Sequence, residues 1–344
     1  MDLLILGGTG FLGPHTVRAA QQRGHTITLF NRGRTNPQLF QGLLQLHGDR
    51  DPKVGDGLKA LAGRRWDAVI DTSGYLPRLV RASAKLLAPS VKQYIFISTV
   101  SVYADFSKLG INETNPVGTL QDQTIEDITS ETYGPLKALC EQAAESAMPG
   151  RVTSIRPGLI VGPGDPTDRF TYWPVRIDRG GEVLAPLPKE APVQFIDVRD
   201  LAQWIIKVIE DGHAGVYNAT GPRAKLTLAQ MLYGCRAATS SAVSFTWVDP
   251  EFLLARGVKP WSELPQWLPG ENDAGQDQVN IDRALSLGLT FRPLAETARD
   301  TIKWHKETRP VDYDFGATEG TFGMKAQRER QVLAAWHARS TPTP

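Results

Sequence analysis

The sequence has only two cysteines, almost no net charge and no long apolar run. Cys140 and Cys235 are far apart and belong to no CxxC or Cys/His spacing, so nothing indicates a disulfide framework or a zinc site. The six histidines show no pairing, and we expect no metal. Lys plus Arg number 38 and Asp plus Glu 37, which gives a net charge of +1 and no general field to attract nucleic acid or an anionic membrane.

No stretch approaches the ~18 consecutive apolar residues of a membrane span. The chain opens directly on "LLILGG", without the basic and apolar regions of a signal peptide. We therefore expect a cytoplasmic protein, although a chain from which a signal peptide had been removed would look the same.

Short apolar, β-branched runs alternate with amphipathic stretches through the first 160 residues. The runs are "LLILGG", "TITLFN", "WDAVIDTSG", "YIFIST" and "RVTSIRPGLI". Buried strands that alternate with crossover helices are typical of a parallel sheet covered on both faces. The sequence therefore predicts an α/β fold with a Rossmann-type doubly wound parallel sheet and a smaller C-terminal substrate lobe.

The character of the chain changes near residue 163, where "GPGDPTDRFTYW" suits a loop or short-helix insertion over a ligand. At 344 residues the chain exceeds a typical domain of ~100 to 200 residues. We predict a dinucleotide-binding domain over 1–163, to which the chain returns at about 193–221. Residues 164–192 and 222–330 then form the substrate-binding lobe, and 331–344 form the end of a C-terminal helix and a tail.

A glycine-rich loop, "GGTGFLG", follows the first predicted strand. Gly7, Gly10 and Gly13 are spaced three apart where a strand should pass into a helix, with Phe11 and Leu12 between the last two. Glycines there permit a tight turn and close approach of the backbone to a pyrophosphate, and the helix N-terminus offers free N–H groups. A glycine triplet alone is a weak signal, but its position at the first junction predicts a dinucleotide site.

The second predicted strand ends at Asn31, where a site selective for NAD usually carries an acidic residue. Arg32 and Arg34 could instead pair with the 2′-phosphate of NADP. One such pair at ~4 Å has a Coulomb energy of ~4 kcal/mol at an effective dielectric of ~20. The pattern favours NADP over NAD. Asp49, after a predicted third strand, could contact the adenine amino group, and we include its neighbour Arg50 in the same cofactor site.

With the glycine loop, "STVSVY" and "YGPLK" in this order, the chain resembles the extended short-chain dehydrogenase/reductase family, the NAD-dependent epimerase/dehydratase group. Further likeness lies in "RPGLIVGPGD", "FIDVRDLA" and "LGLTFRPLAETARDTIKWH", so it covers most of the chain. The motifs are specific for the family and name no substrate.

The resemblance implies roles for individual residues. Tyr133 would be the acid/base on a substrate hydroxyl or carbonyl, Lys137 would lower its pKa and hold the nicotinamide ribose, and Thr99 would bond the reacting oxygen. Bringing a phenol from its free pKa of ~10 to near 7 takes ~4 kcal/mol, which an ammonium one helical turn away can supply. The family also implies cofactor contacts at Thr72, Gly74 and Pro157.

Two departures from the family bear on the substrate. Val100 and Ser101 occupy the positions of the Asp-Glu pair of dehydratases, which counts against removal of water from a sugar nucleotide. The sequence shows no well-placed set of basic residues that would have to bind the diphosphate of a nucleotide substrate. Arg169, Arg199 and Arg292 are candidates for that contact. The aromatic side chains near 170–173 and 261–267 could line a pocket or pack in the core. We name Tyr75, Ser101 and Arg169 as substrate-binding candidates.

The leading hypothesis is an NAD(P)-dependent oxidoreductase or epimerase that moves hydride at a carbinol or ketone carbon of a sugar-like small molecule. Two alternatives stay open, namely a reductase of an aromatic or phenolic ketone or enone, and a non-catalytic NAD(P)- or RNA-binding protein on the same fold. We expect no nucleic-acid partner, no membrane partner, and a monomer or homodimer.

Overall fold

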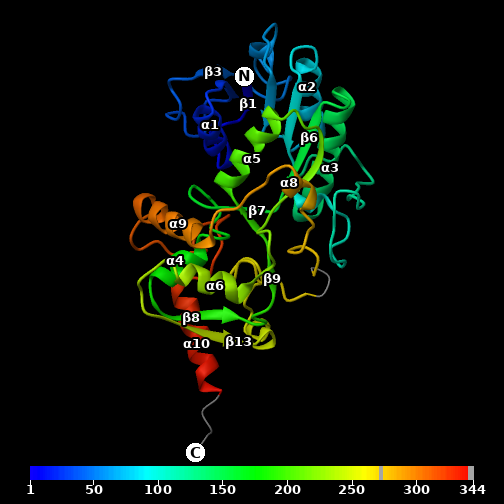
Figure 1. The fold of residues 1–344 in the computed structure, drawn as a ribbon. Coiled ribbons are helices and arrows are strands. Elements are labelled where there is room, and N and C mark those ends of the chain that lie inside the picture. Colours follow the sequence, from blue (N-terminus) through cyan, green and yellow to red (C-terminus); the bar gives the residue numbers. More distant parts are fainter. Residues whose placement is uncertain (271–273, 340–344) are drawn as a thin grey trace, which may run out of the picture. The chain divides into compact units, whose positions relative to one another are not determined.

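The structure, a computed structural model, describes residues 1–270 and 274–339 (Figure 1). The chain forms two compact units. Unit 1 comprises Met1–Leu159, Val198–Gly221 and Val279–Thr290, and unit 2 comprises Ile160–Asp197, Pro222–Gln278 and Phe291–Pro344.

Unit 1 is built on a seven-stranded sheet in the order β11-β6-β5-β4-β1-β2-β3. All six strand pairs run parallel, which confirms the predicted doubly wound sheet. Its strands are β1 (Asp2–Leu6), β2 (Thr26–Asn31), β3 (Leu44–His47), β4 (Ala68–Asp71), β5 (Gln93–Ile97), β6 (Val152–Pro157) and β11 (Gly215–Ala219).

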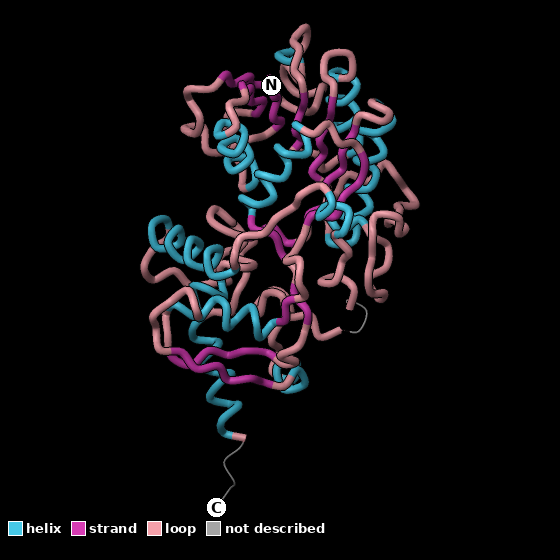
Figure 2. Tube along the Cα trace, in the orientation of Figure 1, coloured by secondary structure: helices cyan, strands magenta, loops and turns pink. Residues whose placement is uncertain are grey.

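The helices of unit 1 flank this sheet, as Figure 2 shows in cyan beside the magenta strands. They are α1 (Leu12–Gln22), α2 (Pro77–Leu87), α3 (Ser130–Ala147), α5 (Val198–Glu210) and α8 (Asp282–Ser286), with two 3-10 turns, η1 (Lys59–Leu61) and η2 (Val100–Val102). The chain moves in opposite directions from β1 to β2 and from β4 to β5, so right-handed crossovers put α1 and α2 on opposite faces. Helix α1 packs beside α5, and α2 packs beside α3.

The strands are buried on both faces, which explains their continuous apolar runs. Leu4, Leu6 and Phe96 from the sheet share one core cluster with Val80 of α2 and Ala144 of α3. Burial of apolar surface at about 25 cal/mol per Å² makes this packing the main source of stability, so the strand ends are held rigidly.

Residues 279–290 belong to unit 1, whereas the sequence pattern led us to place them in the C-terminal lobe. Val279 joins a core cluster with Val100 and Ala138, and the Asn280 N–H donates to the Ile111 carbonyl at 2.7 Å. These contacts link positions more than 100 residues apart, which no local pattern could indicate.

Unit 2 contains three pairs of short strands and a group of helices. Strands β8 (Gly181–Pro186) and β13 (Val243–Val248) pair in parallel, β9 (Pro192–Val193) pairs with β12 (Leu226–Thr227), and β7 (Leu159–Val161) pairs with β10 (Phe195–Asp197). The helices are α4 (Tyr172–Asp178), α6 (Leu228–Arg236), α7 (Pro250–Ala255), α9 (Leu294–Thr308) and α10 (Ala326–Ala338). Helices α4, α6 and α9 pack against one another.

Among the described residues, no helix combines the length and the apolar character that crossing a membrane requires. The same residues contain no group of three or more His, Cys, Asp or Glu side chains placed to hold a metal ion.

Candidate cofactor and active site

The predicted site residues of unit 1 follow the carboxyl ends of its strands. Because the sheet is parallel, these ends lie along one edge, and the strand order reverses between β1 and β4. Open α/β sheets bind ligands outside the carboxyl ends at such a switch point. The segment 7–13 follows β1, 72–75 follows β4 and 99–101 follows β5, so the fold brings these three segments to the place where a dinucleotide would bind.

The glycine loop has the conformation that its residue types permit. Gly7 and Gly8 adopt φ angles of 104° and 90°, which residues other than glycine rarely adopt. The Gly7 N–H donates to the Phe30 carbonyl at 2.9 Å and ties the loop to β2. A Cβ atom on Gly13 would lie 2.5 Å from the backbone carbon of Gly8, so helix α1 can begin this close to the loop only with glycine there.

Gly10 differs from the other loop glycines because a Cβ atom built on it meets nothing within 4 Å. Gly10 is exposed and lies just before Phe11, the N-cap residue of α1. An open backbone position before a helix N-terminus is what a pyrophosphate needs for close approach. The loop therefore fits a dinucleotide.

The two glycines give a matched pair of predictions. We expect Gly13→Ala to lower the free energy of unfolding by about 1–3 kcal/mol, since the added methyl group displaces backbone. Gly10→Ala should leave that free energy within about 0.5 kcal/mol of wild type and should weaken nucleotide binding about tenfold or more, because the methyl group fills the approach path. Urea unfolding and nucleotide titration measure the two effects. Equal nucleotide affinity in wild type and Gly10→Ala would remove the loop from the site.

The loop after β2 folds back toward the glycine loop. The Asn31 side chain accepts a hydrogen bond from the Gly33 N–H at 2.7 Å, and the Asn36 side chain donates to the Thr9 carbonyl at 2.8 Å. Arg32 and Arg34 lie in this loop with exposed side chains. Asn31 thus shapes the turn that carries both arginines, which is a role that the sequence did not indicate.

The turn after β3 contains Asp49 and Arg50, which have different surroundings. The Asp49 side chain is half-buried and accepts a hydrogen bond from the Asp51 N–H at 2.9 Å. Arg50 instead forms a buried ion pair with Asp71, the last residue of β4. Both terminal nitrogens of Arg50 contact the Asp71 carboxylate, and a cofactor contact by Arg50 stays a prediction.

The turn after β4 packs directly on the glycine loop. The Thr72 hydroxyl donates to the Leu6 carbonyl at 3.0 Å and would lie 2.5 Å from a Cβ atom on Gly7. Gly74 is buried under Phe96 and Val80, where a Cβ atom would be 2.6 Å and 2.8 Å from their side chains. The two segments that would hold the cofactor therefore position each other.

Thr99 and Ser101 lie in the turn after β5. Thr99 has extended backbone and caps η2, where its hydroxyl accepts the Ser101 N–H at 3.1 Å. Its side chain is buried, whereas Ser101 is exposed. Ser98 is buried too, and its hydroxyl has no hydrogen-bond partner. Pro157, the last residue of β6, is buried in the neighbouring strand.

Helix α3 carries Tyr133 and Lys137, and it begins earlier than the sequence suggested. We expected Pro135 to mark the helix start near Gly134, but the helix starts at Ser130. Thr129 caps it by accepting the Thr132 N–H, and the Tyr133 N–H already donates to the Thr129 carbonyl at 3.0 Å. Pro135 therefore stands inside the helix, where it has no N–H to donate to the carbonyl of Glu131 in the first turn.

Gly134 permits the close packing of α3 against η2. A Cβ atom at Gly134 would lie 2.0 Å from the Ser101 carbonyl oxygen, which is too close for any residue with a side chain. The glycine between Tyr133 and Pro135 thus brings the first turns of α3 alongside the segment 99–101. The sequence displayed this glycine within "YGPLK", but only the structure shows what it contacts.

Lys137 is held at the carboxyl end of the sheet. Its Nζ donates to the Gly74 and Ile97 carbonyls, both at 2.6 Å, and lies 4.3 Å from the centroid of the Phe96 ring and 5.2 Å from that of Tyr75. Burial lowers the pKa of Lys137 to about 8. The ammonium is therefore held between the turn after β4 and the last residue of β5.

The remaining substrate candidates differ in their surroundings. Tyr75 is 46% exposed beside Lys137, and burial of its hydroxyl end raises its pKa. Arg169 belongs to unit 2, where its Nε donates to the Thr167 hydroxyl at 3.0 Å. Phe170, Tyr172 and Trp173 are fully buried within unit 2, so of the two readings of these aromatic residues the structure supports core packing.

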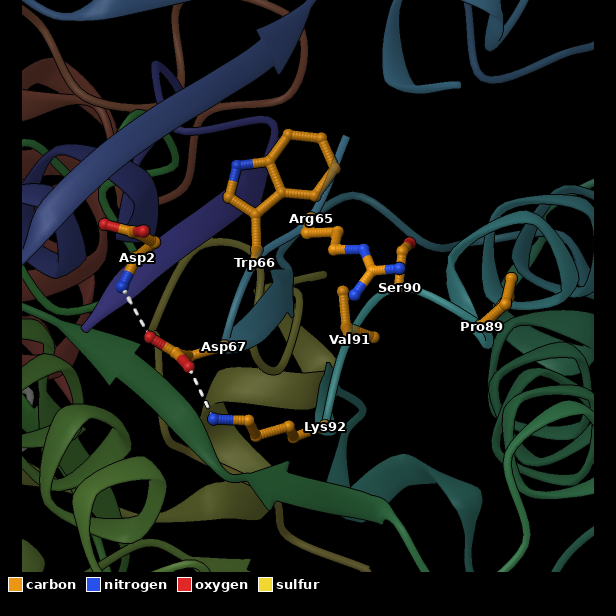
Figure 3. A pocket seen from close by; sticks show the side chains of 8 residues that line it. All are labelled: Asp2, Arg65, Trp66, Asp67, Pro89, Ser90, Val91 and Lys92. Atoms are coloured by element: carbon orange, nitrogen blue, oxygen red, sulfur yellow. Dashed lines mark hydrogen bonds and ion pairs between the residues drawn. The ribbon is translucent and has the colours of Figure 1, made fainter. Parts of the chain in front are cut away.

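A pocket of about 330 Å³ lies at the other edge of the sheet in unit 1 (Figure 3). Asp2 begins β1, and Asp67 and Lys92 precede β4 and β5, so the pocket is at the amino ends of these strands. It is lined by Asp2, Arg65, Trp66, Asp67, Pro89, Ser90, Val91 and Lys92. None of the predicted site residues contributes to it.

Known proteins resemble this chain over most of its length. Residues 3–220 match the model of the NAD dependent epimerase/dehydratase family. Among curated proteins, the chloroplast stem-loop binding protein of 41 kDa b of Arabidopsis thaliana is 28% identical over 94% of this chain and 81% of its own length.

Two solved structures share the fold. Human epimerase family protein SDR39U1, solved with NADPH, is 20% identical with a TM-score of 0.60 and covers 88% of this chain and 99% of its own. UDP-glucose 4-epimerase from Thermotoga maritima, solved with UDP-glucose, is 19% identical with a TM-score of 0.64 and covers 90% of this chain and 99% of its own. At these identities the likeness shows the fold alone. The family match spans the glycine loop, the turn after β5 and the helix that carries Tyr133. It identifies the chain as an NAD(P)-dependent oxidoreductase or epimerase. On this combination of motif order, sheet topology and sequence match, the chain belongs to the NAD-dependent epimerase/dehydratase family of extended short-chain dehydrogenases/reductases.

Proposed function

We propose that this protein transfers hydride at a carbinol or ketone carbon of a sugar-like substrate, with Tyr133 as the acid/base. The observation that carries the proposal is the placement of Lys137, whose ammonium is buried at the carboxyl edge and held by the carbonyls of Gly74, after β4, and of Ile97, the last residue of β5. A buried cation that has no carboxylate partner among the described residues is costly to maintain, which is typical of a functional group.

The chain's own residues would divide the work as follows. Gly7, Gly10 and Gly13 with the N-terminus of α1 would bind the pyrophosphate, and Asn31, Arg32 and Arg34 would face the adenosine ribose. A bound nicotinamide supplies or accepts the hydride.

Tyr133 would give a proton to the substrate oxygen during reduction and take it back during oxidation. Thr99 would donate a hydrogen bond to the same oxygen, and the Lys137 ammonium would stabilise the phenolate form of Tyr133 by its charge. Thr72, Gly74 and Pro157 would line the cofactor side of the site.

The substrate class is supported by two observations. The sugar-nucleotide epimerase from Thermotoga maritima has the same fold. Val100 and Ser101 stand where a dehydratase would have the acidic pair that removes water. To test the class, UDP-glucose and a panel of aromatic and aliphatic ketones should be incubated with the protein and each nicotinamide. Epimerised or oxidised sugar supports the proposal, whereas turnover of the ketones alone would favour the reductase alternative.

Selectivity for the cofactor is a separate prediction. We expect the protein to bind NADPH more tightly than NADH, since Arg32 and Arg34 are exposed in the loop after β2 and no acidic residue ends that strand. Arg32→Ala with Arg34→Ala should weaken NADPH binding about tenfold, or ~1.4 kcal/mol, and leave NADH binding unchanged. Fluorescence titration measures both. Arg65→Ala, at the opposite edge of the sheet, is the matched control. Tighter binding of NADH by the wild type would contradict the assignment.

Binding of stem-loop RNA is a second candidate function, because the Arabidopsis relative with that name aligns with 94% of this chain. Binding to a hairpin RNA that falls steeply with salt, together with no turnover of any carbonyl or sugar tested, would favour it. The buried ammonium of Lys137 is the feature that such a function leaves unexplained.

A further inference from the structure

Asp71 is a fully buried carboxylate for which the proposed chemistry gives no direct role. It ends β4 and is 0% exposed. Both Arg50 terminal nitrogens contact it, and the Tyr94 hydroxyl donates to its Oδ2 at 2.7 Å. Despite burial, the charge and hydrogen bonds of Arg50 keep the pKa of Asp71 below its usual range. The pair is therefore ionised within unit 1.

Contacts from this pair extend to the turn that holds Lys137. The Asp71 Oδ1 accepts the Ser73 N–H at 3.1 Å, and Arg50 also donates to the Ser73 hydroxyl at 3.2 Å. A Cβ atom on Gly74 would lie 3.0 Å from the Asp71 Oδ2, so the carboxylate lies directly against the residue whose carbonyl accepts the Lys137 ammonium. Asp71 thus contacts the turn whose Gly74 carbonyl accepts a hydrogen bond from Lys137.

Charges around Lys137 come from several elements. Cys140 and Glu141 lie on its own helix, Asp71 ends β4, and Arg50 follows β3. Burial raises the pKa of the Cys140 thiol to about 12, so that group is neutral where Lys137 titrates. Glu141 is paired with Arg156 of β6 at 2.6 Å. The Tyr75 ring lies near the ammonium, and Tyr133 precedes it by one helical turn. The charges of two ion pairs therefore act on the Lys137 ammonium, which has no ion-pair partner of its own among the described residues.

We propose that Asp71 and Arg50 are a positioning pair for Lys137, in which the carboxylate fixes the turn at 73–74 and the two opposite charges cancel at the ammonium. The proposal rests on the role of Lys137 in the proposed function. It assigns Arg50, which the sequence pattern placed among the cofactor contacts, to the support of the catalytic lysine. It also explains why an aspartate ends the otherwise apolar run "AVID".

Opposite substitutions in the pair should have opposite effects. Asp71→Asn keeps the shape and leaves the Arg50 charge unopposed, so Lys137 should lose its proton about one pH unit lower than in wild type. Arg50→Gln leaves the Asp71 charge unopposed and should shift that titration upward. The double variant Arg50→Met with Asp71→Leu removes both charges. Its Lys137 titration midpoint should therefore lie within about half a pH unit of the wild-type value. A merely structural role would not reverse sign between the two single variants.

The titration can be followed without substrate. NMR of protein labelled with ¹³C at the lysine Cε carbons reports the protonation of each lysine, and the signal absent in Lys137→Arg identifies residue 137. The wild-type midpoint should lie near pH 8. Asp67→Asn is the matched control, because Asp67 precedes the same strand at its opposite end and pairs with Lys92 at 2.8 Å (Figure 3). It should leave the midpoint unchanged.

Midpoints that stay within about 0.3 units of wild type in both single variants, or that move in the same direction, would overturn the proposal. If Asp71→Asn does not fold, Arg50→Gln and the double variant still decide, because the double variant replaces a buried pair by apolar groups that such sites often accept. Shifted midpoints in a protein that turns over no substrate would leave the pair established and count against the proposed function alone.

Discussion

Tyr133→Phe should lower kcat by about 10²- to 10⁴-fold, the usual effect of removing a positioned general acid/base. The substitution removes one hydroxyl from a half-buried side chain near the start of α3. Folding and nucleotide binding should persist, because Gly134 and Pro135, which set the packing of this turn, are unchanged. Turnover with the substrate found by screening, nucleotide titration and thermal unfolding measure the three effects.

The control for this variant is Tyr233→Phe in unit 2, where the tyrosine is 48% exposed on α6. It loses the same hydroxyl and should keep wild-type turnover. Turnover of Tyr133→Phe within a few-fold of wild type would remove Tyr133 from the chemistry and leave Thr99 without its predicted partner.

Loss of the Lys137 ammonium should have the second largest effect. We expect Lys137→Met to lower kcat/KM by about 10²-fold or more, since the phenolate of Tyr133 loses the charge that stabilises it. In the wild type, kcat/KM should fall as the pH rises through about 8, where Lys137 loses its proton in the free enzyme. This alkaline limb should be missing in the methionine variant.

The same lysine should leave a signature in stability. The pKa of Lys137 is about 8 in the folded protein and 10.5 when unperturbed, as in the unfolded chain. Below pH 8 the lysine is protonated in both the folded and the unfolded protein. Between pH 8 and pH 10.5 it is protonated only in the unfolded protein. The free energy of unfolding of wild type relative to Lys137→Met should therefore rise by about 3 kcal/mol from pH 7 to pH 11. Urea unfolding at both pH values measures it. A difference independent of pH would show that Lys137 is hydrated and has an ordinary pKa.

The parts of the fold and of the candidate site that depend on local pattern could be predicted from the sequence. The glycine loop, the parallel strands and the order of the family motifs can be recognised within windows of a few residues, because each reflects a local backbone requirement or the burial of one strand. Consequently the sheet of unit 1 and the edge that carries the site were predictable.

The start of α3 was missed although its signal is local, because Thr129 caps the helix only a few residues before Pro135.

Features that depend on distant contacts were not predictable. Arg50 pairs with Asp71 across 21 positions, and Asp71 itself was missed, although a single acidic residue at the end of an apolar strand could have drawn attention to it. Gly134 was visible in the sequence, but its contact with Ser101 depends on how α3 packs.

The central claim is that this chain couples hydride transfer to a proton moved by Tyr133. The most direct measurement is a single turnover with NADPH deuterated at the hydride-donating carbon of the nicotinamide, using the oxidised form of the substrate found by screening. The account predicts that deuterium appears on the carbinol carbon of the product in the wild type, and that Tyr133→Phe binds the same nucleotide but slows the transfer by about 10²-fold or more. Product without deuterium, or equal transfer rates in the two proteins, would contradict it.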